Sequence, residues 1–323
     1  MLKGLPFLSF LKALAQLVRL PNVLIITLTQ VLLRYCFILP CLYSEAPDSI
    51  SPLPDFLLLV FVTVLIAVGG YVINDYFDVK IDRINRPGSM VVNKLISGHT
   101  AIKLHILLNG IAILLGFFLA WRIKAISFGF VFPFISGLLW IYSAKYKRML
   151  LWGNIIVSAL SSCVIIIVLL CEFFRLRLNP DQFTAVIPDI HWVTQVFLAY
   201  STFAFLVSMV REIIKDMEDA EGDKTAGCKT LPLVAGMENT RIAVAAILFI
   251  TIIFLGYAMI ILYSLGLYLA FGYFIIAVQC TAFYLLVKLF YARKKRDYHY
   301  LSRLSKLIMV AGILSMGVIF ISK

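Results

Sequence analysis

Hydrophobic residues in this chain form long stretches that short polar segments separate. A run of about 20 apolar residues is the length of an α-helix that crosses a bilayer. Nine such runs occur, and they lie near residues 20–39, 56–73, 106–121, 125–142, 154–170, 192–210, 242–263, 265–287 and 307–322. The pattern predicts an all-α protein, a polytopic membrane bundle of nine transmembrane helices.

The composition agrees with this pattern. Hydrophobic residues make up 62% of the 323 residues and charged residues 14%, whereas a soluble domain carries about 25% charged residues. We therefore expect one membrane-embedded domain over residues 1–323. Its first segment, residues 1–19, is amphipathic and lacks a small-residue cleavage site, so a mature surface helix is expected rather than a signal peptide.

Basic residues gather in alternate polar segments. The four basic segments contain Arg86, Lys94 and Lys103, then Lys145, Lys147 and Arg148, then Lys215, Lys224 and Lys229, then Arg293, Lys294, Lys295 and Arg296. The positive-inside bias predicts that these segments and the N-terminus are cytoplasmic. Topology and contacts with anionic membrane lipids account for the formal net charge of +12, so no nucleic-acid partner is expected.

One basic residue, Arg34, lies inside the first apolar run. An arginine in a membrane span either extends to the interface or faces a polar interior. We expect Arg34 to extend to the outer interface.

Aspartates follow two of the apolar runs directly, both at the predicted cytoplasmic side. Each set has members at positions i, i+3 and i+7, and the sets are Asp75, Asp78 and Asp82, and Asp216, Asp219 and Asp223. On a continuous helix the members of one set lie within about 60° of each other. Such a face repels itself unless a cation neutralises it.

Carboxylate oxygens suit Mg²⁺, which commonly bridges a few carboxylates to substrate phosphates. We therefore predict that all six aspartates contribute to metal binding and that the ligand is a diphosphate. Asp75, Asp78, Asp216 and Asp219 are the expected principal catalytic carboxylates. The alternative is that these acids are solvated or paired with neighbours such as Lys215.

A bound diphosphate also needs hydrogen-bond donors from the protein. The candidates from the polar segments are Asn74, Arg86, Lys145, Lys147, Arg148, Arg211 and Lys215. Each basic residue taken alone is more often a topology signal than a ligand.

The aspartate sets resemble the signatures of a known family. Asn74-Asp75-x-x-Asp78-x-x-x-Asp82, followed by Arg86-Pro87, resembles the first signature of the UbiA superfamily of intramembrane prenyltransferases. Asp216-x-x-Asp219-x-x-Gly222-Asp223 resembles the second. Tyr142-Ser143, Lys147-Arg148 and Gly153-Asn154 resemble the region between the signatures, and Arg19, Pro21 and Asn22 resemble the entry of the first helix.

The resemblance implies helices around a central cavity, with residues 75–103 and 211–241 forming cytoplasmic cap loops. It also implies Mg²⁺-dependent transfer of a prenyl group from its diphosphate. Breaking an allylic C–O bond leaves a carbocation, which needs a dry cavity and aromatic faces. Asn22, Tyr71 and Tyr142 are the residues expected to line that cavity and stabilise the cation.

The sequence indicates the acceptor substrate less clearly than it indicates the diphosphate donor. Residues 211–232 resemble most the branch that prenylates the hydroxyl of geranylgeranylglyceryl phosphate, with geranylgeranyl diphosphate as the favoured donor. An aromatic acceptor of a quinone, chlorophyll or haem pathway is the alternative. An ion-coupled transporter is a different class, and it is disfavoured because the middle of each apolar run contains almost no ionisable residues.

Overall fold

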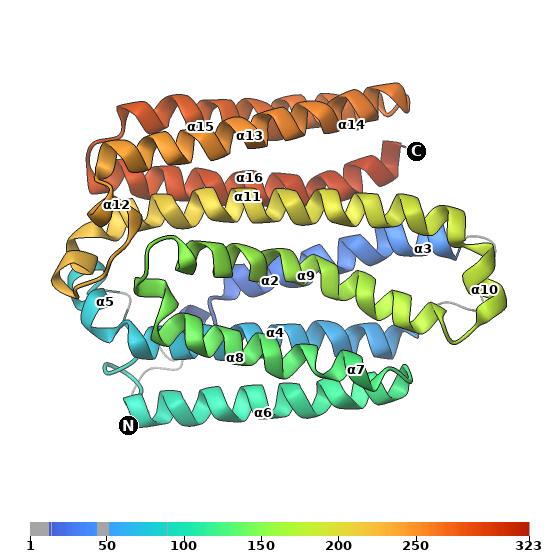
Figure 1. Ribbon diagram of the computed structural model, residues 1–323, viewed down its shortest axis with the longest axis horizontal. Coiled ribbons are helices and arrows are strands. Elements are labelled where there is room, and N and C mark those ends of the chain that lie inside the picture. Colours follow the sequence, from blue (N-terminus) through green and yellow to red (C-terminus); the bar gives the residue numbers. More distant parts are fainter. Residues whose placement is uncertain (1–12, 14, 44–51, 89, 323) are drawn as a thin grey trace. The chain divides into compact units, whose positions relative to one another are not determined.

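The computed structural model describes residues 13, 15–43, 52–88 and 90–322, so the expected surface helix over residues 1–19 lies mostly outside the described residues. The described chain is helical, with no β-strand and one isolated bridge between Val92 and Ile96 (Figure 1). The predicted all-α class is confirmed.

Nine helices of the described chain are long and apolar enough to cross a membrane. They are α2–η1–α3 (Leu20–Leu42), α4 (Leu53–Phe77), α6 (Gly98–Arg122), α7–α8 (Ile126–Ala144), α9 (Trp152–Leu176), α11 (Ile187–Thr225), α13 (Met237–Ser264), α14–η4–α15 (Tyr268–Tyr291) and α16 (Lys295–Ser322). Shorter helices lie between them: α5 (Val79–Asn85), η3 (Tyr146–Arg148), α10 (Pro180–Ala185) and α12 (Leu231–Val234). Each long helix overlaps one predicted run, so the predicted number and order are confirmed.

The chain divides into two compact units. The first contains residues 1–28, 49–147 and 168–185, and the second contains residues 29–48, 148–167 and 186–323. Each unit therefore contains one of the two aspartate sets. That the whole chain forms a single domain stays a prediction.

In the first unit, α4 packs against α6 and α8 (Figure 1). The approach is close at Gly69, where an added Cβ would lie 2.2 Å from Asn109 Nδ2. The buried polar groups at this contact satisfy one another, since His105 Nδ1 lies 2.8 Å from the Gly69 carbonyl oxygen and Ser136 Oγ donates to Asn109 Oδ1 at 2.7 Å. These contacts hold α4 one to two turns before the first aspartate set.

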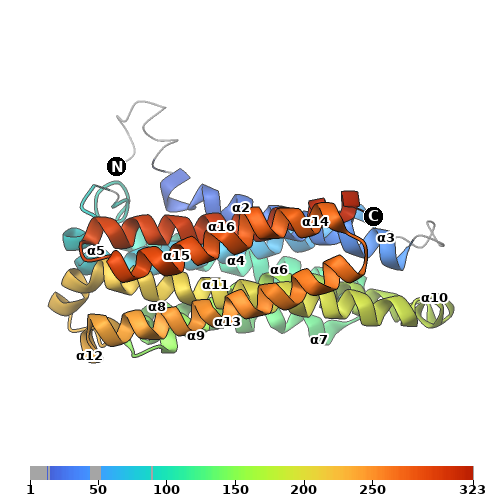
Figure 2. The same ribbon diagram turned by 90° about the horizontal axis from the view of Figure 1, so that it is seen from above.

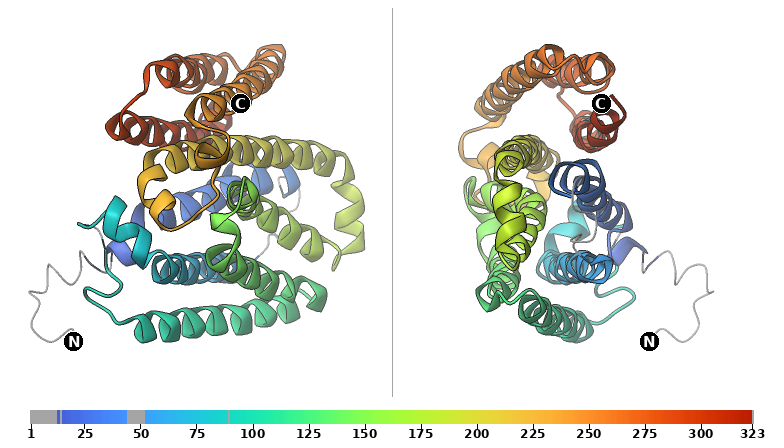
Figure 3. Two further views of the ribbon diagram at one scale, coloured as in Figure 1. Left: turned by 60° about the vertical axis from the view of Figure 1, so that its left-hand side comes forward. Right: turned by 90° about the vertical axis from the view of Figure 1, so that its right-hand side faces the viewer.

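In the second unit, α11 packs against α13 and α16, and α15 lies beside α16 (Figures 2 and 3). A Cβ on Gly312 of α16 would lie 2.2 Å from the Phe203 ring, so only glycine permits this helix contact. The second aspartate set lies near the end of α11, and these contacts fix that helix.

Arg34 opens η1 (Arg34–Ile38), a π-helical stretch within the first long helix, and it is only 2% exposed. The prediction that its side chain extends to the outer interface was therefore wrong. Burial of the guanidinium inside the protein is the arrangement that the structure adopts.

Asp55 near the start of α4 is buried and joins three helices of the first unit. Arg122 Nε, at the end of α6, lies 2.5 Å from Asp55 Oδ1, and Arg175 Nη1, at the end of α9, lies 3.3 Å from Oδ2. Removing one member of a buried charge group leaves the others uncompensated.

We predict that Asp55→Ala lowers the free energy of unfolding by about 1–3 kcal/mol, a range discounted because both arginines are partly exposed. Thermal unfolding in detergent measures the change. Asp181→Ala, at an exposed position of α10, is the matched control. Equal midpoints for the two variants would contradict a structural role for the Asp55 cluster.

Candidate functional site

The first aspartate set lies across a helix junction. Helix α4 ends at Phe77, Asp78 has φ −87° and ψ −2°, and α5 begins at Val79. The Asp78 amide still donates to the Asn74 carbonyl at 2.9 Å, and the Asp82 amide donates to the Asp78 carbonyl at 2.8 Å. The helix is therefore interrupted at Asp78 rather than continuous, although the helical hydrogen bonds bridge the junction.

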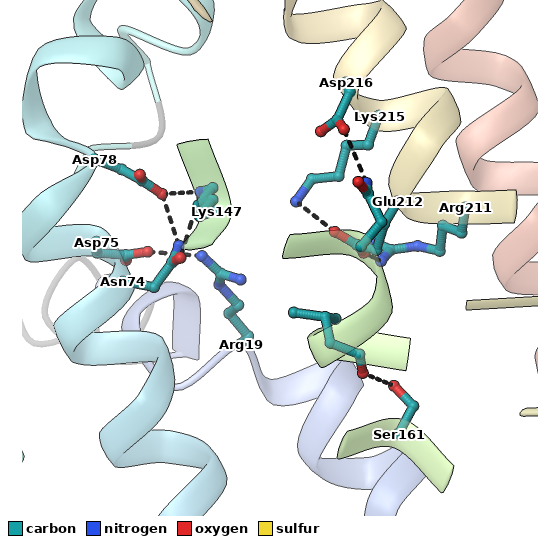
Figure 4. A network of polar contacts seen from close by, with 12 residues as sticks. Arg19, Asn74, Asp75, Asp78, Lys147, Ser161, Arg211, Glu212, Lys215 and Asp216 are labelled. Atoms are coloured by element: carbon teal, nitrogen blue, oxygen red, sulfur yellow. Dashed lines mark hydrogen bonds and ion pairs between the residues drawn. The ribbon is translucent and has the colours of Figure 1, made fainter. Parts of the chain in front are cut away.

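Asp75 and Asp78 each contact a cationic side chain in the first unit (Figure 4). Arg19 Nη2 lies 2.7 Å from Asp75 Oδ1, and the Arg19 guanidinium lies 4.9 Å from the centre of the Tyr71 ring. Lys147 Nζ forms an ion pair with Asp78 Oδ2. The carboxylates at the end of α4 are thus compensated by bases that come from other segments of the chain.

Asn74 completes this arrangement. Its Nδ2 donates to Asp78 Oδ2 at 2.7 Å, and its Oδ1 accepts from Lys147 Nζ at 3.3 Å. Asn74, Asp78 and Lys147 therefore form a closed triangle of polar contacts (Figure 4). The side chains of Asn74 and Lys147, both predicted to bind diphosphate, meet at the predicted metal ligand Asp78.

The charges in the first unit influence one another. Burial, followed by repulsion from the Asp78 carboxylate, raises the pKa of the Asp82 carboxyl. Burial alone would lower the pKa of Lys147, but the Asp78 carboxylate raises it above its usual range. At Arg19, burial would likewise lower the pKa, but the Asp75 carboxylate raises it above its usual range. A further cation at this cluster would relieve the repulsion on Asp82.

The second aspartate set lies in the second unit on α11, which continues without interruption to Thr225. The predicted helical spacing of Asp216, Asp219 and Asp223 is therefore confirmed. Asn154, near the start of α9, donates from Nδ2 to Asp216 Oδ2 at 2.8 Å. This contact fixes the orientation of one carboxylate of the set.

Glu212 lies one turn before Asp216 and contacts both neighbouring bases (Figure 4). Arg211 Nη1 donates to Glu212 Oε1 at 2.5 Å, and Lys215 Nζ lies 3.9 Å from Glu212 Oε2. Glu212 was not among the predicted site residues. The sequence feature that could have identified Glu212 is its position between two bases, directly after Arg211 and three residues before Lys215.

The remaining predicted residues have varied surroundings. Lys145 is exposed, with its ammonium 5.9 Å from the centre of the Tyr146 ring. In the first unit Arg86 is half-buried and interacts with Asp82, and Tyr142 is buried and interacts with Lys147. Asn22 is half-buried near the start of α2 (Leu20–Leu33). Thus Arg86 lies near Asp82 and Tyr142 near Lys147, whereas Lys145 lies near a tyrosine.

In the second unit, the Arg148 carbonyl accepts a hydrogen bond from the Lys229 amide at 2.9 Å. This bond joins the last residue of η3 to the turn after α11, where Gly227 has φ +70°. The two basic side chains are therefore carried by directly bonded segments.

The expected cap loops are largely helical. Helix α11 extends to Thr225, and α12 and α13 occupy most of the remainder up to residue 241. Residues 75–103 contain the end of α4, helix α5 and the start of α6. The description of these segments as loops was wrong, because their charged residues continue or restart helices.

Between α5 and α6, the chain packs inward. Val91 and Val92 are buried against Val72 and Ala101 in an apolar cluster of the first unit. The turn therefore has an apolar anchor on α4 beside the first aspartate set. That this segment moves as a cap stays a prediction.

Within the described residues, no three His, Cys, Asp or Glu side chains converge closely enough to hold a metal ion by themselves. Mg²⁺ is usually held by one or two carboxylates together with substrate phosphates and water. The donor chemistry therefore fits Mg²⁺, because Asp75 and Asp78 lie at one helix end in the first unit and Asp216 and Asp219 lie one turn apart in the second.

Comparison with known proteins identifies relatives over most of the chain. A sequence profile of the UbiA prenyltransferase family matches residues 35–306. The digeranylgeranylglyceryl phosphate synthase of Thermococcus sibiricus is 32% identical over 198 residues, which cover 61% of this chain and 62% of that protein. The synthase of the same name from Pyrococcus furiosus is 33% identical over 210 residues, which cover 64% and 66%. The chain thus matches slightly less than two thirds of the length of these relatives.

Solved structures share the fold. A structure described as a digeranylgeranylglyceryl phosphate synthase in membranes superposes with a TM-score of 0.63 at 24% identity, covering 97% of this chain and 99% of the other. A UbiA homologue from Archaeoglobus fulgidus, bound to DMAPP and Mg²⁺, gives a TM-score of 0.53 at 17% identity and covers 94% and 98%. The similarity extends over nearly the whole chain.

We predict that Lys147→Ala lowers the free energy of unfolding by about 1–3 kcal/mol, because it leaves the buried Asp78 carboxylate without its cation. Lys145→Ala, two residues away and exposed, should change it by less than about 0.5 kcal/mol. Thermal unfolding of the ligand-free protein compares the two. A larger loss for Lys145→Ala would contradict the assignment of Lys147 as the compensating cation.

Proposed function

The chain belongs to the UbiA prenyltransferase family, and from this premise we propose that it transfers a geranylgeranyl group from its diphosphate to the hydroxyl of geranylgeranylglyceryl phosphate. Its nine apolar helices, counted over the described residues, make it an integral multi-pass membrane protein. The observation that carries the proposal is the cluster of Asn74, Asp75, Asp78 and Lys147 at one helix end.

The aspartates have the role of metal ligands in this proposal. Mg²⁺, when bound with the donor, supplies positive charge that stabilises the leaving diphosphate. Asp75 and Asp78 would hold Mg²⁺ in the first unit, and Asp216 and Asp219 would hold it in the second. The third members, Asp82 and Asp223, support these ligands.

The bases bind the phosphate oxygens. The Lys147 ammonium already lies beside Asn74 and Asp78, so a diphosphate at that carboxylate falls within its reach. Arg86, Arg211 and Lys215 add positive charge near the two aspartate sets, and Asn74 donates an amide hydrogen bond. Charge-assisted hydrogen bonds of this kind are about twice as strong as neutral ones.

Cleavage of the allylic C–O bond leaves a carbocation that aromatic faces stabilise. The Tyr71 ring already holds the Arg19 guanidinium at 4.9 Å, so its face accepts a positive charge. Tyr142 and Asn22 are the other proposed cavity residues. The acceptor hydroxyl oxygen then bonds to the allylic carbon, and its proton passes to the departing diphosphate or to an aspartate.

A phosphorylated glycerol acceptor needs cationic groups of its own. Arg148 and Lys229 lie on segments that a backbone hydrogen bond joins, and Lys224 is exposed at the end of α11. These residues support a phosphorylated acceptor over an uncharged one. The positive-inside pattern supports a cytoplasmic location for this end of the helices.

We predict that Asp78→Asn and Asp219→Asn each lower the rate by on the order of 10²–10⁴, because each removes a ligand for the charge that develops in the transition state. The assay is Mg²⁺-dependent release of diphosphate from geranylgeranyl diphosphate in the presence of acceptor. Glu221→Gln, at an exposed position of α11, should retain the wild-type rate. Wild-type turnover by Asp78→Asn would exclude the assigned role.

The acceptor is tested separately. We predict that purified protein with labelled geranylgeranyl diphosphate and Mg²⁺ forms product with geranylgeranylglyceryl phosphate and not with hydroxybenzoate or dihydroxynaphthoate. Lipid extraction and chromatography detect the product. Product with an aromatic acceptor alone would overturn the acceptor assignment and leave the diphosphate assignment in place.

A further inference from the structure

The second unit contains a cavity of about 430 Å³. One face of α11 and one face of α13 form most of its wall. The turn after α13, the first residue of η4 (Phe274–Gln279), α16 and Phe37 of η1 complete it. Figure 3, in its right-hand view, looks along these helices. The wall includes Ala199, Tyr200, Phe203 and Ala258.

The cavity is remote from the second aspartate set on the same helix. Tyr200 precedes Asp216 by 16 residues, which corresponds to about 24 Å along the helix axis at 1.5 Å per residue. The same separation turns the helix by about 160° relative to Asp216 at 3.6 residues per turn. The cavity therefore faces away from the Asp216 side of α11 and lies in another part of its length.

The two hydroxyl groups of the wall, on Tyr200 and Ser315, are already hydrogen-bonded. Ser315 Oγ donates to the Gly312 carbonyl at 2.6 Å, so Tyr200 Oη is the donor in its 2.8 Å hydrogen bond to Ser315 Oγ. No charged side chain is among the described residues that line the cavity, and Gln195 is exposed. The wall therefore suits an apolar ligand and offers nothing to neutralise a charged one.

The size of the cavity matches one lipid chain. An apolar cavity of about 150 Å³ holds benzene, so 430 Å³ accommodates about 17 carbon atoms in proportion. An apolar space left empty loses the dispersion contacts of its lining. A hydrocarbon chain restores those contacts.

Lipid chains are also the nearest available ligand. Ile253, Tyr257 and Ile260 of α13 are 58%, 64% and 67% exposed. In a membrane-spanning helix such an apolar face contacts the bilayer, while the neighbouring residues Phe254, Ala258 and Ile261 line the cavity. The exposed apolar residues of α13 thus lie next in sequence to residues that line the cavity.

We propose that this cavity is a binding site for one hydrocarbon chain of a bilayer lipid, separate from the sites of the reacting donor and acceptor. The chain packs between α11, α13 and α16 and takes no part in the transfer reaction. Its role is to fill the second unit and stabilise it.

The test compares two alanine-to-phenylalanine variants on α13. Ala258→Phe places a ring in the cavity, whereas Ala246→Phe places one on an exposed position of the same helix outside the wall. Each protein is reconstituted with palmitoyl-oleoyl phosphatidylcholine, extracted into mild detergent and measured by native mass spectrometry. We expect one retained phospholipid in the wild type and in Ala246→Phe, and at least tenfold lower retention in Ala258→Phe.

Ala199→Leu, a smaller change on the opposite wall, repeats the test if Ala258→Phe does not fold. Equal retention in the filled and control variants, or none in the wild type, would overturn the proposal. The KM for geranylgeranyl diphosphate provides a second readout and should change less than twofold in the filled variant. A tenfold rise in that KM would show that the cavity holds a substrate chain instead and would also overturn the proposal.

Discussion

Charge compensation inside apolar helices is the constraint on which the rest of this structure depends. A carboxylate buried in a membrane bundle is costly unless a cation lies beside it. Asp55 contacts Arg122, Asp78 contacts Lys147, and Glu218 of α11 lies 2.8 Å from His299 Nδ1 of α16. The partners of each contact come from different helices. Two of these contacts are ion pairs and the third is a hydrogen bond to a histidine. Together they connect helix ends within each unit.

In the ion pair at the first aspartate set, the acid and the base differ in solvent exposure in a way that suits a reaction site. The Asp78 side chain is 5% exposed, whereas the Lys147 side chain is 29% exposed. The acid is thus held by its surroundings, and the long basic side chain has room to change partner. Lys147 compensates Asp78 in the ligand-free protein. In the proposed function it would transfer its contact to a phosphate oxygen if a metal ion bound the carboxylate.

The sequence predicted the features that depend on the length of apolar runs and on the spacing of residues within one helix. The apolar runs are long enough that the nine membrane-spanning helices of the described chain could be counted from the sequence. The aspartates on α11 keep their predicted spacing because that helix is uninterrupted. The break at Asp78, the burial of Arg34 and the three-helix contact of Asp55 depend on partners far away in the chain. Asp55 and Arg175, for example, are 120 residues apart. Such contacts have no signature in a single sequence.

The most direct test concerns Asp78, the buried carboxylate that we propose as a metal ligand for the donor diphosphate. Mg²⁺-dependent binding of a non-reactive thiolodiphosphate analogue is measured calorimetrically for the wild type, for Asp78→Asn and for the control Glu221→Gln. We predict that Asp78→Asn weakens binding by about tenfold or more, because it removes a charged ligand of the metal, whereas Glu221→Gln binds like the wild type. Equal affinities for the wild type and Asp78→Asn would contradict the assignment of Asp78 as a metal ligand.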